Sequence, residues 1–290
     1  MAERKPVVGI VGMGLIGGSL AKAIRKNTEG AYRVLGADLD PKTMAKAKVA
    51  DVIEGELTPE AYKDCDYLLI ALYPAAVLSF LEKNAPLFNP HGVVIDCAGI
   101  KRDICALGGA LADRYGFTFI GGHPMAGREV WGFSAATNTL FNGASMILCP
   151  RGDIDIRILA RVKEFFLSVG FGRITVRTPA DHDRIIAYTS QLAHVLSSAY
   201  IGSATAEEHR GLSAGSFKDM TRVATINGEM WSEIFLANRE PLLSEIDGLI
   251  DRLCAFRAGI AGNDRDLLRR LMKEGNDRKK ECFKKIEEES

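Results

Sequence analysis

The sequence has no excess of charge of either sign, because 37 Lys and Arg residues balance 37 Asp and Glu residues. Without a basic surplus, no net field draws the chain to nucleic acid or to an anionic membrane. The apolar stretch that begins at Val7 is interrupted by glycines, and it is too short for a signal peptide or a membrane span. We therefore expect a cytoplasmic protein that binds neither nucleic acid nor membrane.

The cysteines are few and scattered: there are six, and no two of them form a CxxC pair. Because most lie in apolar runs, we expect buried, reduced thiols, and we predict no metal site. Apolar residues, in contrast, make up 47% of the chain, which is typical of a globular protein with a substantial core. A length of 290 residues suggests one large domain or two ordinary ones.

Short apolar runs alternate with helical patterns up to about residue 178. This alternation predicts an α/β domain with a parallel sheet covered by helices on both faces. The predicted strands are 7–11, 33–37, 67–72, 93–95, 117–120, 145–149 and 173–176. Beyond residue 178, only patterns with helical spacing follow, at 185–204, 230–256 and 265–286. We predict two domains, 1–178 and an all-α domain 179–290 whose helices bury apolar stripes against a second copy.

A glycine-rich loop follows the first predicted strand and opens a predicted helix. Its sequence is Gly12-Met13-Gly14-Leu15-Ile16-Gly17, a GxGxxG pattern. The first glycine makes a tight turn, the second lets the backbone approach a pyrophosphate, and the third lets the helix pack closely on the strand. The pyrophosphate rests on the amide end of the helix, at Leu15 and Ile16. The pattern predicts a Rossmann-type dinucleotide site; the alternative is a glycine-rich turn that binds nothing.

The second predicted strand ends in an acidic residue, Asp38, about 20 residues after the loop. A carboxylate there accepts hydrogen bonds from the ribose hydroxyls and repels a 2′-phosphate. Leu39 and Asp40 follow it, where an Arg or Ser would favour NADP, so we predict NAD as the cofactor. Tyr73 ends a later apolar run and is predicted to border the cofactor, with ordinary packing as the alternative.

His123 is the first candidate for proton transfer. It follows a predicted strand, between glycines and a proline, and we expect a tight turn that presents it to the ligand. Histidine is suited to moving a proton near neutral pH, although a lone histidine is more often structural. Glu129 lies six residues later and either pairs with a cation at the site or is an ordinary surface residue.

The helical part carries the remaining candidates. Ser190 and His194 are spaced i and i+4, so they share one helix face as a buried pair or as the wall of a site. Arg222 offers a planar donor suited to a substrate carboxylate, unless it forms an internal salt bridge, for instance with Asp219. Trp231 either shapes the pocket or belongs to the core.

Taken together, these segments resemble the prephenate/arogenate dehydrogenases of tyrosine biosynthesis. The matching stretches are 12–19 (GMGLIGGS), 96–101 (DCAGIK), 123–129 (HPMAGRE), 190–194 (SQLAH) and 215–231 (GSFKDMTRVATINGEMW), with Asn238 downstream. The resemblance implies a Rossmann-type domain followed by a helical domain that forms a homodimer. It implies NAD-dependent oxidative decarboxylation of prephenate to 4-hydroxyphenylpyruvate, with arogenate, which gives tyrosine directly, as the alternative small-molecule substrate.

The resemblance also implies roles for the candidate residues. His123 would accept the hydrogen bond and the proton of the ring hydroxyl as hydride departs. Arg222 would bind a substrate carboxylate, and Glu129 would sit opposite it and order the site. Ser190 and His194 would line the substrate site, and Trp231 would support it. Neither an appended ACT-type sensor nor a fused mutase is expected in this polypeptide.

Two positions depart from the family pattern. Gly99 stands where the family often has a serine that partners the catalytic histidine, and Gln191 stands where it often has a histidine. These departures motivate a different hypothesis, a catalytically weak NAD-binding dimer that acts as a sensor. A third hypothesis is another dehydrogenase with a Rossmann head and a helical tail, such as a β-hydroxyacid or imino-acid reductase.

Overall fold

The computed structural model describes residues 4–128 and 130–288. By its internal packing the chain divides into two compact units, Met1–Arg239 and Glu240–Ser290. The predicted domain boundary near residue 178 divides the sheet-forming part of the sequence from the helical part, and this boundary stays a prediction.

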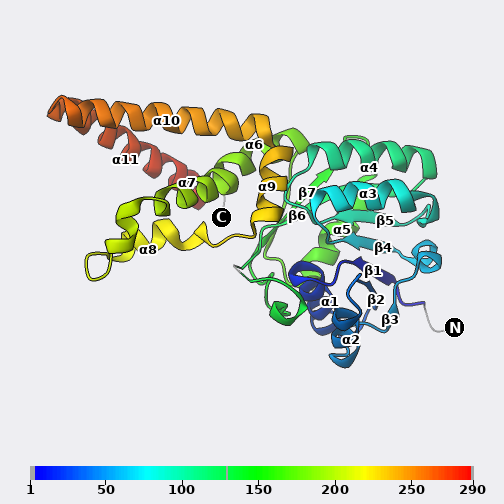
Figure 1. Ribbon diagram of the computed structural model, residues 1–290. Helices are drawn as coiled ribbons and strands as arrows, with labels where there is room; N and C mark the ends of the chain where they lie inside the picture. The colour runs from blue at the N-terminus through cyan, green and yellow to red at the C-terminus, as the bar shows by residue number, and fades with distance from the viewer. Residues whose placement is uncertain (1–3, 129, 289–290) are drawn as a thin grey trace. The chain divides into compact units, whose positions relative to one another are not determined.

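The first unit is built on one eight-stranded sheet with the order β3-β2-β1-β4-β5-β6-β7-β8 (Figure 1). Strands β1 to β6 are parallel to one another, in the order of a Rossmann fold. The predicted Rossmann-type α/β domain is therefore confirmed. The strands are β1 (Val7–Val11), β2 (Arg33–Ala37), β3 (Gly55–Glu56), β4 (Tyr67–Ile70), β5 (Val93–Asp96), β6 (Thr118–Pro124), β7 (Ser145–Pro150) and β8 (Arg173–Val176).

The predicted parallel sheet contains one antiparallel pair that the sequence analysis did not foresee. Strands β6 and β7 are antiparallel, with Ile120 opposite Pro150 and Pro124 opposite Met146. A parallel neighbour usually needs a crossover helix. In the described part of the segment 125–144, the helical structure is one short turn, η3 (Phe133–Ala135), and the chain returns beside β6 in the opposite direction.

Helices cover both faces of the sheet, and each face has its own apolar core. Side chains alternate between faces along a strand, so Val8 and Ile10 of β1 enter one core while Val7 and Val11 enter the other. The first face carries α1 (Leu15–Asn27), α2 (Pro41–Val49) and α5 (Ile156–Val169), and the second carries α3 (Pro74–Asn84) and α4 (Arg102–Tyr115), with short turns η1 (Pro59–Asp64) and η2 (Ala85–Leu87).

After β8, the described residues form helices and turns, as predicted. Helix α6 packs on α4, and α9 packs on α3, which ties this helical part to the sheet within the first unit. Its elements are α6 (Pro179–Ile186), the π-helical turn η4 (Ala187–Gln191), α7 (Leu192–Ile201), η5 (Ala204–Glu208), α8 (Gly215–Thr221), η6 (Arg222–Ala224) and α9 (Gly228–Ala237).

The second unit is a pair of helices, α10 (Arg239–Ala261) and α11 (Arg265–Glu288). Only residues 262–264 join them, so the two helices form a tight hairpin. Gly259 allows the close approach, since a Cβ there would lie 2.9 Å from Cδ2 of Leu268. Within the described residues, every helix is too short or too polar to cross a membrane.

Candidate active site at the carboxyl edge of the sheet

The glycine loop has the geometry of a phosphate cradle. Gly12 has φ +87°, and a Cβ there would lie 2.5 Å from the carbonyl oxygen of Ala71. A Cβ at Gly17 would overlap the carbonyl oxygen of Gly12, so this glycine lets helix and strand pack closely. A Cβ at Gly14 would meet no protein atom within 4 Å. Since nothing in the chain itself requires glycine at Gly14, the open space beside it fits a ligand that approaches the backbone.

Asp38 and the start of α1 complete this half of the site. The Asp38 carboxylate accepts hydrogen bonds from the backbone N–H of Met13 (2.7 Å) and of Asp40 (2.9 Å), which hold it beside the loop. Helix α1, which begins at Leu15 and Ile16, has no side-chain cap and no acidic residue in its first turn. Its amide end therefore suits an anion. These residues fit a dinucleotide, with the pyrophosphate at α1 and a ribose at Asp38.

The other candidates of the sheet lie at the same edge. Strands β1, β4, β5 and β6 are parallel, so their carboxyl ends, where the glycine loop, Tyr73, Asp96 and His123 lie, share that edge. Tyr73 is the N-cap of α3, and 49% of it is exposed, so ordinary core packing does not account for it.

His123 lies within strand β6, not on the tight turn that we predicted. It pairs with Ile147 of β7, and the ladder between the two strands keeps its backbone extended. The preceding glycines serve packing instead of a turn. A Cβ at Gly121 would overlap the Sγ of Cys105, and a Cβ at Gly122 would lie 2.7 Å from Cε of Met146.

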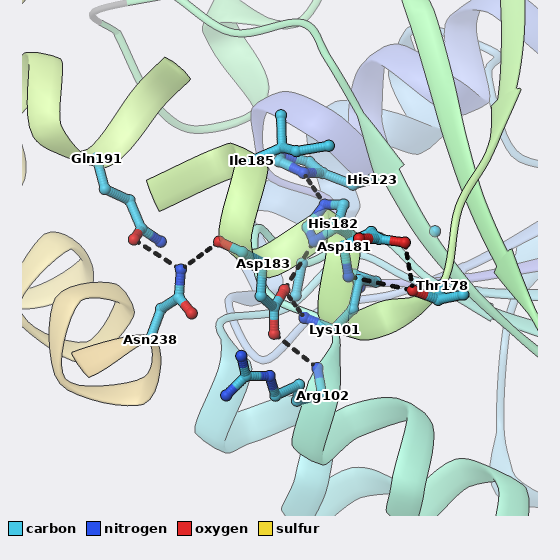
Figure 2. Close-up of polar contacts among 12 residues, drawn as sticks. Lys101, Arg102, His123, Thr178, Asp181, His182, Asp183, Ile185, Gln191 and Asn238 are labelled. Carbon is cyan, nitrogen blue, oxygen red and sulfur yellow. Dashed lines mark hydrogen bonds and ion pairs between the residues drawn. The ribbon is translucent and has the colours of Figure 1, made fainter. Parts of the chain in front are cut away.

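A chain of polar groups begins at the half-buried His123 ring and continues to the buried His182 and Asp183. Its Nδ1 lies 2.8 Å from Nε2 of His182, and Nδ1 of His182 lies 2.7 Å from Oδ1 of Asp183 (Figure 2). The Asp183 carboxylate also accepts hydrogen bonds from the backbone N–H of Lys101 (2.8 Å) and of Arg102 (2.9 Å), at the start of α4. Sequence reasoning missed His182 and Asp183, because the packing of α6 on α4 brings them to His123.

The start of helix α6 delivers this pair. The Thr178 hydroxyl accepts a hydrogen bond from the backbone N–H of Asp181 (3.1 Å) and donates one to the Asp181 carboxylate (3.0 Å). Pro179 occupies the first turn, where its missing N–H costs nothing. This capping arrangement fixes the first turn of α6, so the orientation of His182, the next residue, is set by local sequence.

Both histidines are held in their neutral form. Burial lowers the pKa of His123 well below 6.5, and the neighbouring His182 ring and the Lys101 ammonium group each make a further positive charge there less favourable. Burial also lowers the pKa of His182, against the opposing hydrogen bond to Asp183. Because neutral imidazole has a free lone pair, His123 is in the form that accepts a proton near pH 7.

A fully buried ion pair lies next to the histidines. Lys101 binds the carboxylate of Asp96, and both side chains are 0% exposed. The same carboxylate accepts hydrogen bonds from the backbone N–H of Ala98 (3.0 Å) and of Gly122 (3.2 Å). This ion pair therefore ties the end of β5 to the strand that carries His123. A buried charge pair is retained only when hydrogen bonds satisfy it in this way.

Gly99, one of the two departures, lies directly beside the proton acceptor. A Cβ on this residue would be 3.8 Å from Nε2 of His123 and 3.8 Å from Cδ1 of Ile234. Those are ordinary contact distances, so a serine would fit there. The chain keeps the space next to Nε2 without filling it with a hydroxyl.

Three of the predicted substrate residues come together in the helical part. Nδ1 of His194 donates a hydrogen bond to the backbone carbonyl of Ser190 (2.8 Å), and the His194 ring stacks on Trp231 with centroids 3.7 Å apart. Ser190 and His194 therefore meet through the Ser190 backbone carbonyl and the His194 ring, and not through both side chains. Ser190 lies in the π-helical turn η4, which ends at Gln191, one residue before α7 begins.

Gln191, the second departure, is completely buried. Its Oε1 accepts a hydrogen bond from Nδ2 of Asn238 (2.9 Å), which also donates to the backbone carbonyl of Asp183 (2.8 Å). Figure 2 shows this link between α9 and the π-helical turn. Gln191 therefore supports the backbone behind the histidine pair.

The predicted roles of the remaining two candidates, Arg222 and Glu129, stay predictions. Arg222 is exposed at the first position of η6, and η6 packs against α7, the helix that carries His194. Glu129 lies outside the described residues. Among the residues that the structure describes, no group of three or more His, Cys, Asp or Glu side chains is placed to hold a metal ion.

Comparison with known proteins now decides the family. Residues 20–176 match the nucleotide-binding domain of prephenate dehydrogenase, and residues 178–274 match its dimerization domain. The chain belongs to the prephenate dehydrogenase family. The resemblance seen in the sequence is confirmed, and so is the predicted arrangement of a nucleotide-binding domain followed by a helical dimerization domain.

Several members of the family are similar over nearly the whole chain. A prephenate dehydrogenase of Bacillus subtilis (strain 168) is 28% identical over 96% of this chain and 76% of its own. The crystal structure of Synechocystis arogenate dehydrogenase is 27% identical, covering 95% of this chain and 99% of its own, with a TM-score of 0.80. Prephenate dehydrogenase from A. aeolicus in complex with hydroxyphenyl propionate and NAD+ is 25% identical, covering 97% and 99%, with a TM-score of 0.81.

Proposed function

We propose that this chain is an NAD-dependent prephenate dehydrogenase, which converts prephenate into 4-hydroxyphenylpyruvate and carbon dioxide. The observation that carries the proposal is the neutral His123 at the sheet edge that also carries the glycine loop. One edge thus combines a cradle for a dinucleotide with a proton acceptor. The A. aeolicus relative, crystallised with NAD+ and a hydroxyphenyl compound, supports the same pairing of ligands.

Bound NAD supplies the hydride acceptor. Nε2 of His123 accepts the hydrogen bond of the ring hydroxyl and takes its proton as hydride leaves the ring carbon that bears this oxygen. The ring carboxylate departs as carbon dioxide, its bonding electrons complete the aromatic ring, and the proton returns to the same oxygen as the phenol. Because aromatisation makes the reaction favourable, the residues mainly position and polarise the substrate.

Substrate binding is assigned to the helical part. Arg222 provides a guanidinium for a substrate carboxylate, a pairing that charge-assisted hydrogen bonds favour. Ser190, His194 and Trp231 form a stacked cluster against which the ring or its side chain packs. Glu129 is proposed to order the site opposite Arg222, on the family resemblance alone.

The direct test of His123 is the variant His123→Asn, which keeps a polar side chain of smaller size. Turnover should fall by roughly 10²- to 10⁴-fold, the usual contribution of positioned proton transfer, while substrate affinity changes little. His91→Asn, at an exposed residue, is the matched control and should behave like the wild type. Turnover of His123→Asn within threefold of wild type would contradict the assigned role.

Arogenate is the second candidate substrate, because the Synechocystis relative is an arogenate dehydrogenase with nearly the same fold. The two substrates differ only in a keto or amino group on the side chain. The sensor hypothesis, in contrast, predicts that the protein binds NAD but turns over neither substrate. Calorimetry that detects NAD binding but no binding of either substrate would favour the sensor.

A homodimer formed through the helical domain is part of the proposal. The match to a dimerization domain supports it, and so do large apolar side chains left exposed on α10, among them Ile250 (49%), Leu253 (53%) and Ile260 (65%). Exposed apolar residues at helical spacing are typical of an interface. Light scattering after size-exclusion chromatography should give twice the mass of 31.5 kDa, and a monomer would contradict this part of the proposal.

A further inference from the structure

We infer that His182 and Asp183 are positioning residues that fix which nitrogen of His123 carries the proton. They keep the proton on Nδ1 and leave the lone pair on Nε2, the atom next to Gly99. The inference rests on the proposed function, in which Nε2 of His123 receives the substrate proton. It adds two residues that the sequence analysis did not single out, and it gives each a specific task.

The carboxylate of Asp183, the last group of the hydrogen-bonded series His123–His182–Asp183, decides which atom donates in each hydrogen bond. Asp183 accepts hydrogen bonds from the backbone N–H of Lys101 and of Arg102, where α4 begins. Both oxygens of this carboxylate thus face N–H donors at the amide end of a helix, and a carboxylate can only accept hydrogen bonds. Nδ1 of His182, 2.7 Å from Oδ1 of Asp183, must therefore carry a proton and donate it.

The same donor and acceptor argument applies to the hydrogen bond between His182 and His123. A neutral His182 with its proton on Nδ1 has a lone pair on Nε2, and this nitrogen lies 2.8 Å from Nδ1 of His123. Nδ1 of His123 must donate across that distance, since two lone pairs face to face would repel each other. Nε2 of His123 is left as an acceptor, on the side where a Cβ of Gly99 would be 3.8 Å away.

This arrangement matters because an isolated neutral imidazole can carry its proton on either nitrogen, and the partner of one nitrogen decides the state of the other. A ring with the proton on Nε2 cannot accept one there. The negative charge of Asp183 also stabilises the imidazolium that forms on proton uptake, which is the part that a buried aspartate performs behind a catalytic histidine.

A matched pair of variants tests the acceptor at position 182. His182→Met keeps an unbranched side chain of similar volume but offers His123 no good acceptor, whereas His182→Gln can present its amide oxygen to Nδ1. We expect kcat to fall at least about tenfold in His182→Met, with KM changed less than about threefold, and His182→Gln to recover most of the loss. Equal losses in both variants would overturn the inference. His91→Gln, at an exposed histidine, is the control.

A spectroscopic readout separates this inference from the proposed function. In protein labelled with ¹⁵N-histidine, the ring nitrogens of the five histidines report which of them is protonated, and His123→Asn assigns the signals. The wild type at pH 8 should show His123 protonated on Nδ1, and His182→Met should move the proton wholly or partly to Nε2. A wild-type ring protonated on Nε2 overturns the inference even if the enzyme turns over prephenate. Absence of turnover with the predicted ring state overturns the proposed function instead.

Discussion

Gly14 and Gly17 of the loop have different roles, and a single alanine substitution at each should separate the two roles. At Gly14 an added Cβ meets no protein atom within 4 Å, and φ −73° with extended ψ suits alanine. The free energy of unfolding of Gly14→Ala should therefore change by no more than about 0.5–1 kcal/mol. A Cβ at Gly17 overlaps the Gly12 carbonyl and lies 3.1 Å from Cγ2 of Ile10. Overpacking of this kind should cost Gly17→Ala about 1–3 kcal/mol or more.

The affinity for NAD should respond differently from stability, because Gly14→Ala should weaken NAD binding although it hardly changes the free energy of unfolding. The Cβ of Gly14→Ala stands where the pyrophosphate approaches the backbone, so about one charge-assisted hydrogen bond is lost, roughly 1.5–3 kcal/mol. That energy corresponds to a Kd for NAD about 10- to 150-fold weaker in a variant that is as stable as the wild type. Denaturant unfolding and calorimetric titration with NAD measure the two quantities on the same samples. Wild-type affinity in a folded Gly14→Ala variant would refute the assignment of the loop as a dinucleotide cradle.

Three further predictions concern the chemistry around His123. Lys101→Met should lower the free energy of unfolding by about 3–5 kcal/mol, because it leaves the Asp96 carboxylate buried without its counter-ion; the exposed Lys83→Met is the control, and denaturant midpoints that match would contradict the argument. Gly99→Ser should change stability by less than about 0.5 kcal/mol and raise kcat modestly, whereas a clear loss of stability would show that the space beside Nε2 is not free. Since the pKa of His123 is lowered well below 6.5, kcat/KM should stay level as pH falls to 6.5 and decline only below it; an acid limb above pH 6.5 would be inconsistent with a neutral, buried base.

Much of the fold could be predicted from local sequence, because its signals are local. The glycine loop, the alternation of apolar runs with helical patterns, and Asp38 after the second strand each depend on residues close together in the chain. The direction of β7 could not be predicted in this way. An apolar run such as 145–149 has the same composition in either direction, and the connection that precedes it decides the pairing.

The candidate site was predictable to the extent that its residues follow strands. His123 was found because strand ends in such sheets face the ligand, although its extended backbone was not foreseen. His182 and Asp183 were missed because only the packing of α6 on α4 brings them to the His123 ring. One sequence signal was available: two titratable residues directly after the capping segment that begins at Thr178. Burial of Gln191 against Asn238 likewise depends on tertiary packing.

The most direct test of the central claim is a matrix of the two candidate substrates with the two nicotinamide cofactors. The purified wild-type chain is mixed with prephenate or arogenate and with NAD or NADP, and the absorbance of reduced nicotinamide is followed together with the aromatic product. We predict that prephenate with NAD gives the highest kcat/KM and that one 4-hydroxyphenylpyruvate forms for each NADH. Absence of turnover in all four mixtures, by protein that is folded and binds NAD, would contradict the account.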